Sequence, residues 1–233
     1  MGDTTQKNVL KCLRKIVICG NIGVGKTTAV RRLVNSIQNS EAVFEQFEEN
    51  EHLPGFYKVL EEKGSGHYNE YCYPTQMAFL TSRAKRELKC QDPERTYILD
   101  RGLMEDKYIF GKNQIDQGFM SEKEIERYTQ QFDQYMEQCK LPDLVVYLKA
   151  DINTLTQRIK KRGRDMEANI SQDYLRSLQT LYDENLIPAL EEKYSNIMML
   201  KYDTTPCAED DVFRKVVQDI LLFDKYLTSQ KED

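Results

Sequence analysis

Short apolar runs, separated by longer amphipathic stretches, set the pattern of this 233-residue chain. The apolar runs have the length and composition of buried strands and cover residues 15–20, 42–44, 96–99, 144–148 and 197–200. Stretches with helical character or helix-start signals occupy 25–39, 56–63, 74–89, 104–112, 121–139, 151–162, 171–193 and 208–226. This alternation predicts an α/β fold with a five-stranded, mostly parallel sheet flanked by helices on both faces.

Chain length suits one domain, and we expect residues 1–233 to form it. Residues 1–12 are mainly polar, so we expect a flexible N-terminal tail there. Local signals within the domain are Ser121 with Glu124, a capping box at a helix start, and Gly163, which breaks a helical pattern.

Composition excludes some classes of protein. The net charge of −5 argues against a protein that coats nucleic acid, and the two histidines argue against a zinc site. No two of the six cysteines form a C-x-x-C pair, so we expect reduced thiols and a cytoplasmic protein. The apolar runs are too short to cross a bilayer and the first 11 residues lack the apolar stretch of a secretory signal, so we expect no membrane partner.

The strongest chemical motif follows the first apolar run. It reads Gly20-Asn21-Ile22-Gly23-Val24-Gly25-Lys26-Thr27-Thr28 and matches the phosphate loop G-x-x-x-x-G-K-[ST] between a strand and a helix. The glycines let backbone N–H groups point toward bound phosphate, where the helix N-terminus adds partial positive charge. We expect Lys26 to reach the β- and γ-phosphates of ATP and the Thr27 hydroxyl to hold Mg²⁺.

Further charged residues follow the ends of other predicted strands. Glu45 follows the second strand, and Asp100-Arg101 follow the third. Because ligands bind beyond the carboxyl ends of parallel strands, we expect these residues to converge with Lys26 on one crevice. Glu45 is our candidate for the base that accepts a hydroxyl proton. Asp100 can orient Mg²⁺ or serve as that base itself, and Arg101 can bind phosphate or the nucleophile's surroundings.

A third cluster is basic and consists of Arg158, Arg162 and Arg164. The first two lie four residues apart and so share a helix face, while Gly163 lets the chain turn before Arg164. We expect a lid over about residues 158–167 that brings these arginines to the transferring phosphate as charge-neutralising groups.

These ordered motifs resemble those of deoxynucleoside kinases, the family that includes deoxycytidine, deoxyguanosine and deoxyadenosine kinases. The resemblance covers the chain from about residue 14 to 215. Besides the phosphate loop, it rests on Glu45 with Leu53-Pro54 and Phe56-Tyr57, on Gln76 with Ser82-Arg83, on Asp100-Arg101 with 106–110, and on Arg158, Arg162, Arg164 and Glu167.

The resemblance implies catalytic roles. Glu45 would deprotonate the 5′-hydroxyl of a deoxynucleoside with help from Arg101. Asp100 and Thr27 would bind Mg²⁺, and ATP would lie in the phosphate loop. The lid arginines would be Arg158, Arg162 and Arg164.

The resemblance also implies an acceptor site. Tyr57 and Glu167 would hold the sugar 3′-hydroxyl. Gln76 would pair with the edge of the base, since an amide offers both a donor and an acceptor. Leu53, Arg83, Asp106 and Phe110 would complete the base site. In the family, the Arg83–Asp106 pairing goes with deoxyadenosine, deoxyguanosine and deoxycytidine, and we lean toward purines.

The chain departs from the family pattern in three places. Gln46-Phe47 follow the base glutamate where many relatives have proline, and Gly102 follows Asp100-Arg101 where serine is usual. The tryptophan that animal relatives carry near the base is absent. These changes leave phosphoryl transfer intact but bear on base preference.

Two other functions remain open from the sequence. A nucleoside monophosphate kinase such as thymidylate kinase would need additional arginines for the acceptor phosphate, to which Arg83 could belong. A non-catalytic nucleotide-binding module would not need Glu45, Lys26, Arg101 and the lid together. For a kinase we expect a small-molecule partner, no nucleic acid polymer, and a homodimer formed through the helices at 74–89 and 121–139, as in relatives.

Overall fold

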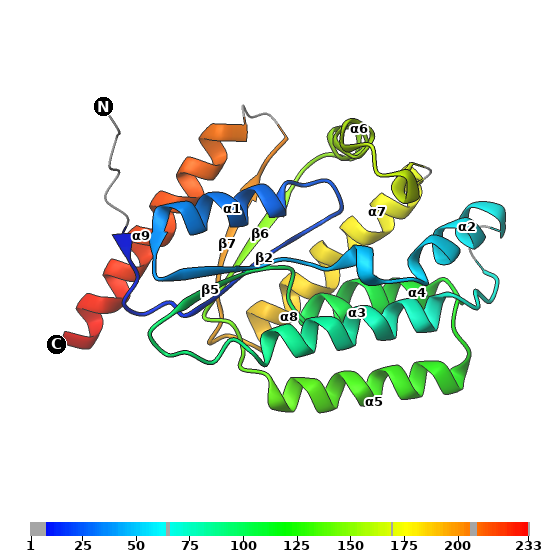
Figure 1. Cartoon of the computed structure of the whole chain (residues 1–233), viewed down its shortest axis with the longest axis horizontal. Coiled ribbons are helices and arrows are strands. Elements are labelled where there is room, and N and C mark those ends of the chain that lie inside the picture. Colours follow the sequence, from blue (N-terminus) through cyan, green and yellow to red (C-terminus); the bar gives the residue numbers. More distant parts are fainter. Residues whose placement is uncertain (1–7, 64–65, 169, 206–208, 233) are drawn as a thin grey trace.

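Five parallel strands form the central sheet of this protein (Figure 1), as the sequence predicts. A computed structural model describes residues 8–63, 66–168, 170–205 and 209–232. The described strands are β1 (Asn8–Val9), β2 (Lys15–Gly20), β3 (Ile37–Gln38), β4 (Ser40–Val43), β5 (Thr96–Asp100), β6 (Leu144–Lys149) and β7 (Met198–Asp203). The main sheet has the order β4-β5-β2-β6-β7, so β2, which precedes the phosphate loop, lies at its centre.

Helices cover both faces of the sheet (Figure 1), with α1 and α9 on one face and α3, α5, α7 and α8 on the other. The described helices are α1 (Lys26–Ser36), α2 (Leu53–Lys63), α3 (Cys72–Glu87), α4 (Lys112–Asp116), α5 (Glu122–Gln138), α6 (Ile152–Arg162), α7 (Gln172–Leu181), α8 (Ile187–Glu192) and α9 (Glu209–Glu232). Short 3₁₀ or π-helical turns are η1 (Phe47–Glu49), η2 (Asp106–Gly111), η3 (Asp165–Glu167) and η4 (Tyr182–Leu186).

The long helix expected at 171–193 is continuous but not uniform. Its middle is the π-helical turn η4, and Pro188 lies in the first turn of α8. Proline has no N–H to donate to the preceding turn, which accounts for a wider turn at this point.

Two local helix signals, the Ser121–Glu124 capping box and the break at Gly163, are confirmed. Ser121 and Glu124 form the capping box at the start of α5. Asp151 caps α6 by accepting a hydrogen bond from the N–H of Thr154, and Gly163 ends α6 in a left-handed conformation.

Residues 8–12 are not the flexible tail expected for 1–12, of which 1–7 lie outside the described residues. β1 pairs with β3, and this pairing follows the end of α1 at Ser36. Leu10 is buried, and the Asp224 carboxylate accepts hydrogen bonds from the N–H groups of Lys11, Cys12 and Leu13 at 2.7, 2.8 and 2.9 Å. The sequence pattern missed this because Asp224 lies more than 200 residues away.

Burial of the central strands explains why they read as continuous apolar runs. Every residue of β2 is buried, as are the first five of β6. Among the described residues, no helix is long and apolar enough to cross a membrane. The five described cysteines are free, and Cys207 lies outside the described residues.

Candidate active site

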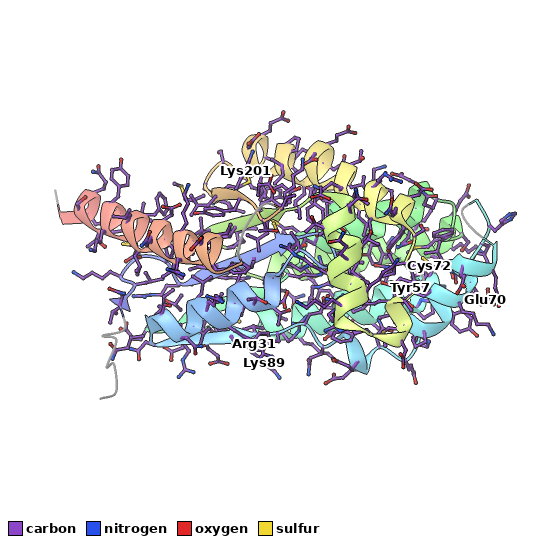
Figure 2. The ribbon with its side chains drawn as sticks, turned by 90° about the horizontal axis from the view of Figure 1, so that it is seen from above. Arg31, Tyr57, Glu70, Cys72, Lys89 and Lys201 are labelled. Atoms are coloured by element: carbon purple, nitrogen blue, oxygen red, sulfur yellow. The ribbon has the colours of Figure 1, made fainter. Side chains whose placement is uncertain are left out.

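A cavity of about 320 Å³ lies where the carboxyl ends of β2, β4 and β5 meet. It brings together most of the residues that the sequence predicts for the site. Those in its wall are Ile22, Gly23, Lys26, Thr27, Glu45, Leu53, Tyr57, Gln76, Arg83, Asp100, Arg101, Phe110, Arg162, Arg164 and Glu167. Figure 2 shows the molecule from above and labels Tyr57, the residue of α2 that lines this cavity.

The phosphate loop has the curled backbone that its glycines predict. Gly20, Gly23 and Gly25 all have positive φ, and a Cβ at Gly20 would lie 2.2 Å from the carbonyl oxygen of Leu148. Only glycine adopts these angles freely, so the loop depends on all three. The loop's remaining predicted residues, Asn21, Val24 and Thr28, belong to the same turn and the start of α1.

Lys26 points back at its own loop in this structure. Its Nζ donates to the carbonyl oxygens of Gly20 at 3.0 Å and Asn21 at 2.8 Å. Burial, followed by the positive charge of Arg101, lowers the pKa of Lys26 to about 8. A buried ammonium at the phosphate loop can exchange these carbonyl contacts for phosphate oxygens.

Two arginines hold Glu45. The Nη2 of Arg83 donates to Oε1, and the Nε of Arg101 donates to Oε2 at 3.1 Å. Burial alone would raise the pKa of Glu45, but the charges of Arg83 and Arg101 outweigh it and lower that pKa to about 2. The carboxylate is therefore ionised throughout the neutral pH range.

Asp100 and Thr27 form the second pair of oxygens in the cavity. The Thr27 hydroxyl donates to Oδ2 of Asp100 at 2.5 Å, and Oδ1 is buried with no hydrogen-bond partner among the described residues. Burial raises the pKa of Asp100. Carboxylate and hydroxyl oxygens are hard ligands, so this pair fits Mg²⁺.

The side chains expected around the nucleobase occupy two layers, one in the cavity wall and one behind it. Gln76 and Arg83 line the cavity, and the Oε1 of Gln76 and the Nε of Arg83 are buried without a partner among the described residues. Asp106 is fully buried, does not reach the cavity wall, and instead accepts a hydrogen bond from Nη1 of Arg83. Asp106 is therefore placed next to the base site through Arg83, and its Oδ2 is also buried without a partner among the described residues, so its role at the base site stays a prediction.

Aromatic rings surround the two arginines. The Arg101 guanidinium carbon lies 4.5 Å from the centre of the Phe110 ring, and that of Arg83 lies 5.2 Å from the Phe79 ring. Leu53, Tyr57 and the two rings supply apolar wall to the same cavity. A flat, half-apolar ligand with polar edges would suit this wall.

The arginines predicted for a lid fall into two groups. Arg162 and Arg164 both donate to the Glu167 carboxylate, the second at 3.3 Å, and the Arg164 guanidinium lies 3.6 Å from the centre of the Phe47 ring. Arg158 does not reach the cavity wall, and it donates to the hydroxyl and carbonyl oxygens of Thr204 at 3.0 and 2.8 Å. The i,i+4 spacing therefore does not bring Arg158 and Arg162 to one place here.

Sequence reasoning missed several residues of the site. Phe47 and Phe79 line the cavity, and Glu105 and Tyr182 are buried against Arg101. Glu105 lies only four residues after Arg101, but Arg101 precedes the helical stretch, so helix spacing did not predict their contact. The contact between Tyr182 and Arg101 depends on the tertiary fold, so no feature of the sequence pointed to it.

Comparisons with known proteins lead to one family. The model of the family described as deoxynucleoside kinase matches residues 16–222. Deoxyadenosine/deoxycytidine kinase of Bacillus subtilis (strain 168) is 28% identical over 192 residues, which cover 79% of this chain and 84% of the relative. Deoxyguanosine kinase of Lactobacillus johnsonii is 28% identical over 202 residues, 82% of this chain and 79% of the relative.

The fold also matches solved structures. Deoxyadenosine kinase from M. mycoides with bound dCTP superposes with a TM-score of 0.70 at 26% identity, over 89% of this chain and 98% of that protein. The likeness therefore extends over nearly the whole of that structure.

Proposed function

The chain belongs to the deoxynucleoside kinase family, and from this membership we propose that it transfers the γ-phosphate of ATP to the 5′-hydroxyl of deoxyadenosine, deoxyguanosine or deoxycytidine. The observation that carries the proposal is a shared cavity: Glu45 lines the same space as the phosphate-loop lysine Lys26 and the unpaired amide oxygen of Gln76. A carboxylate with a phosphate site and a polar-edged pocket for a flat group is what transfer to a nucleoside hydroxyl requires.

The acceptor's base would pair with Gln76 and Arg83. Their unpaired Oε1 and Nε are an acceptor and a donor, and leaving them buried and unmatched costs stability until a base edge binds. The sugar 3′-hydroxyl would bind Tyr57 and Glu167. Because Glu167 also holds Arg162 and Arg164, sugar binding and the lid share one carboxylate.

Glu45 would accept the proton of the 5′-hydroxyl. A pKa of about 2 makes it a weak base. Phosphoryl transfer has a loose transition state in which the nucleophile's proton leaves late, so an ionised, well-oriented carboxylate is adequate. Asp100 lies against the Thr27 hydroxyl, so the two side chains supply a pair of oxygens for Mg²⁺, which favours the metal role for Asp100 and leaves the proton role to Glu45.

Thr27 and Asp100 would hold Mg²⁺ through oxygens. A bound Mg²⁺ supplies neutralisation of phosphate charge. Arg162 and Arg164 would add positive charge from the lid, and Lys26 from the phosphate loop. Arg158 would act on ATP only after leaving Thr204, so its role is the least supported of the lid arginines.

A monophosphate acceptor fits the cavity less well. Arg83 is the arginine available for an acceptor phosphate, and its guanidinium is already bound by the carboxylates of Glu45 and Asp106. Two carboxylates beside that position would repel a second phosphate.

Two further features of the proposal concern the whole protein. Free thiols at the five described cysteines suit the reducing cytoplasm.

We also propose a homodimer formed through α3 and α5, which pack against each other at one side of the molecule (Figure 1). Light scattering would measure the mass in solution, and a monomer at micromolar concentration would contradict the dimer.

The test of function is a phosphate-transfer assay. Purified protein is mixed with ATP, Mg²⁺ and each of the four deoxynucleosides or thymidine monophosphate. We expect transfer to deoxynucleosides, and Glu45→Gln should lower kcat more than about a hundredfold because the proton acceptor is lost. Glu48→Gln, which changes an exposed glutamate of the same cavity wall, is the matched control and should change kcat less than about threefold. Transfer to thymidine monophosphate alone would indicate a monophosphate kinase, and no transfer to any acceptor would refute the proposed function.

A further inference from the structure

Behind Arg101 lies a buried polar cluster that the chemistry proposed above does not use. Its members are Glu105, at the start of the η2 region, and Tyr182, the first residue of η4. Glu105 is 1% exposed and Tyr182 is not exposed, and neither lines the cavity. Burying a carboxylate and a phenol hydroxyl together costs free energy unless both are well hydrogen-bonded. Their hydrogen-bond partners therefore indicate what role the two residues have.

The partners converge on one nitrogen of Arg101. Its Nη1 donates to Oε1 of Glu105 at 2.8 Å, to the Tyr182 hydroxyl oxygen at 2.9 Å and to the Gly20 carbonyl oxygen at 3.1 Å. On the opposite side of the same guanidinium, Nε donates to Glu45. Arg101 is therefore held from behind by the cluster and bound to the proposed base in front.

The backbone of Arg101 also needs this support. Its φ is +69°, a left-handed conformation that strains a residue with a Cβ. The N–H of the following Gly102 donates to Oε2 of Glu105 at 3.1 Å, so Glu105 binds both the strained turn and the guanidinium that emerges from it.

The cluster further contacts the start of the phosphate loop. The Tyr182 hydroxyl, which has one proton to donate, lies within hydrogen-bond distance of two acceptors, Oε1 of Glu105 and the Gly20 carbonyl oxygen, the latter at 2.8 Å. The Gly20 N–H faces Oε1 of Glu105 at 3.5 Å. Burial, followed by the charge of Glu105, raises the pKa of Tyr182, so its hydroxyl keeps the proton that it donates. One buried carboxylate and one hydroxyl thus join the phosphate loop to the arginine that holds Glu45.

We propose that Glu105 and Tyr182 are positioning residues for phosphoryl transfer, which hold Arg101 so that its Nε stays directed at Glu45. The inference rests on the proposed function. Neither residue touches substrate, and both act through Arg101. Without them the Arg101 guanidinium can turn and shift Glu45. This slows phosphoryl transfer but leaves the nucleobase site and the phosphate loop in place.

The test begins with two conservative variants and one control. Tyr182→Phe removes only the hydroxyl, and Glu105→Gln keeps the shape but removes the charge. The control is Tyr147→Phe, because the Tyr147 ring stacks on Tyr182 with centroids 5.5 Å apart while its hydroxyl binds Asp183 at 3.1 Å, outside the cluster. We expect Tyr182→Phe and Glu105→Gln to lower kcat about tenfold or more with both KM values within about threefold, and Tyr147→Phe to change kcat less than about twofold.

A double-mutant cycle separates positioning from general stabilisation. Tyr182→Phe is combined with Arg101→Lys. The lysine ammonium cannot bond to the Glu105–Tyr182 cluster and to Glu45 from two sides, as the arginine guanidinium does. If Tyr182 acts through Arg101, adding Tyr182→Phe to Arg101→Lys should change kcat less than about twofold. Thermal unfolding of each variant shows how much folded protein is assayed, and kcat is expressed per folded protein.

The possible results are distinct. Wild-type kcat in Tyr182→Phe, losses that multiply in the double variant, or an equal loss in Tyr147→Phe would each overturn the positioning role while leaving the kinase activity established. Failure of the unmodified protein to phosphorylate any deoxynucleoside would overturn the proposed function and, with it, this inference.

Discussion

The Thr27 hydroxyl donates to Oδ2 of Asp100 across 2.5 Å, although the two residues lie 73 positions apart, Thr27 in the helix after β2 and Asp100 at the end of β5. The contact brings together the two oxygens that the sequence assigned to Mg²⁺, and it leaves Oδ1 of Asp100 buried without a partner among the described residues. Burying an unpaired carboxylate oxygen costs free energy that a purely structural role does not recover. The pair is therefore a suitable place to test for Mg²⁺ binding.

Asp100→Asn should lower kcat by about a hundredfold or more and raise the Mg²⁺ concentration needed for half-maximal rate, because an amide oxygen is a weaker ligand than a carboxylate. Initial rates measured over a Mg²⁺ titration give both quantities. Asp183→Asn, which changes a surface carboxylate bound to Lys149 at 2.8 Å, should leave the titration unchanged. An unshifted midpoint in Asp100→Asn would remove Asp100 from the metal site.

ATP use should depend on pH through Lys26. Because burial and Arg101 lower the pKa of Lys26 to about 8, the ligand-free protein carries an ammonium below pH 8 and a neutral amine above it. Phosphate binding favours the ammonium, so log(kcat/KM) for ATP should fall above pH 8 with a slope that approaches −1.

Lys26→Arg provides the control for this profile. Arginine keeps its charge at these pH values, so the variant should be less active but should lack the decline between pH 8 and 9.5. A decline of the same midpoint and slope in Lys26→Arg, or a flat profile in the unmodified protein, would assign the pH dependence elsewhere.

Base recognition should depend on Gln76. Gln76→Leu keeps the approximate volume of the side chain but removes the amide whose Oε1 is buried and unpaired, leaving the base edge without its partners. We expect kcat/KM for the preferred deoxynucleoside to fall about a hundredfold, with KM for ATP within about twofold. Steady-state kinetics with each substrate varied separately checks this. Gln130→Leu on the exposed side of α5 is the control, and an equal effect there would argue against a specific contact.

Asp224 should matter for stability and not for catalysis. Its carboxylate accepts hydrogen bonds from the N–H groups of Lys11, Cys12 and Leu13 at 2.7, 2.8 and 2.9 Å. Asp224→Asn replaces one acceptor oxygen by a donor NH₂ group, so the free energy of unfolding should fall by about 1–3 kcal/mol. Denaturant unfolding measures this change.

The matched control for Asp224 is Asp211→Asn on the same helix. Asp211 is exposed and forms a 3.5 Å ion pair with Arg214 at the surface, so the change should be under about 0.5 kcal/mol. Both variants should keep the kcat of the unmodified protein. A loss of kcat in Asp224→Asn without a loss of stability would mean that the N-terminal segment acts on the site.

The sequence by itself determined the sheet and the place of the site. Apolar runs bounded by charged residues are local features, and the rule that parallel strands present their carboxyl ends together converts them into a common crevice. Lys26, Glu45 and Arg101 could therefore be brought together without coordinates, and all three line one cavity. The glycines of the phosphate loop were equally readable, because the need for positive φ is a property of single residues.

The tertiary structure decided which charged groups face each other. Asp106 lies behind Arg83, Arg158 binds Thr204, and Tyr182 supports Arg101 from 81 residues away. Sequence spacing fixes which residues share a helix face, but the direction of a long side chain depends on partners brought by other elements. The same reason explains residues 8–12, which look like a polar tail until the fold sets Asp224 beside their N–H groups.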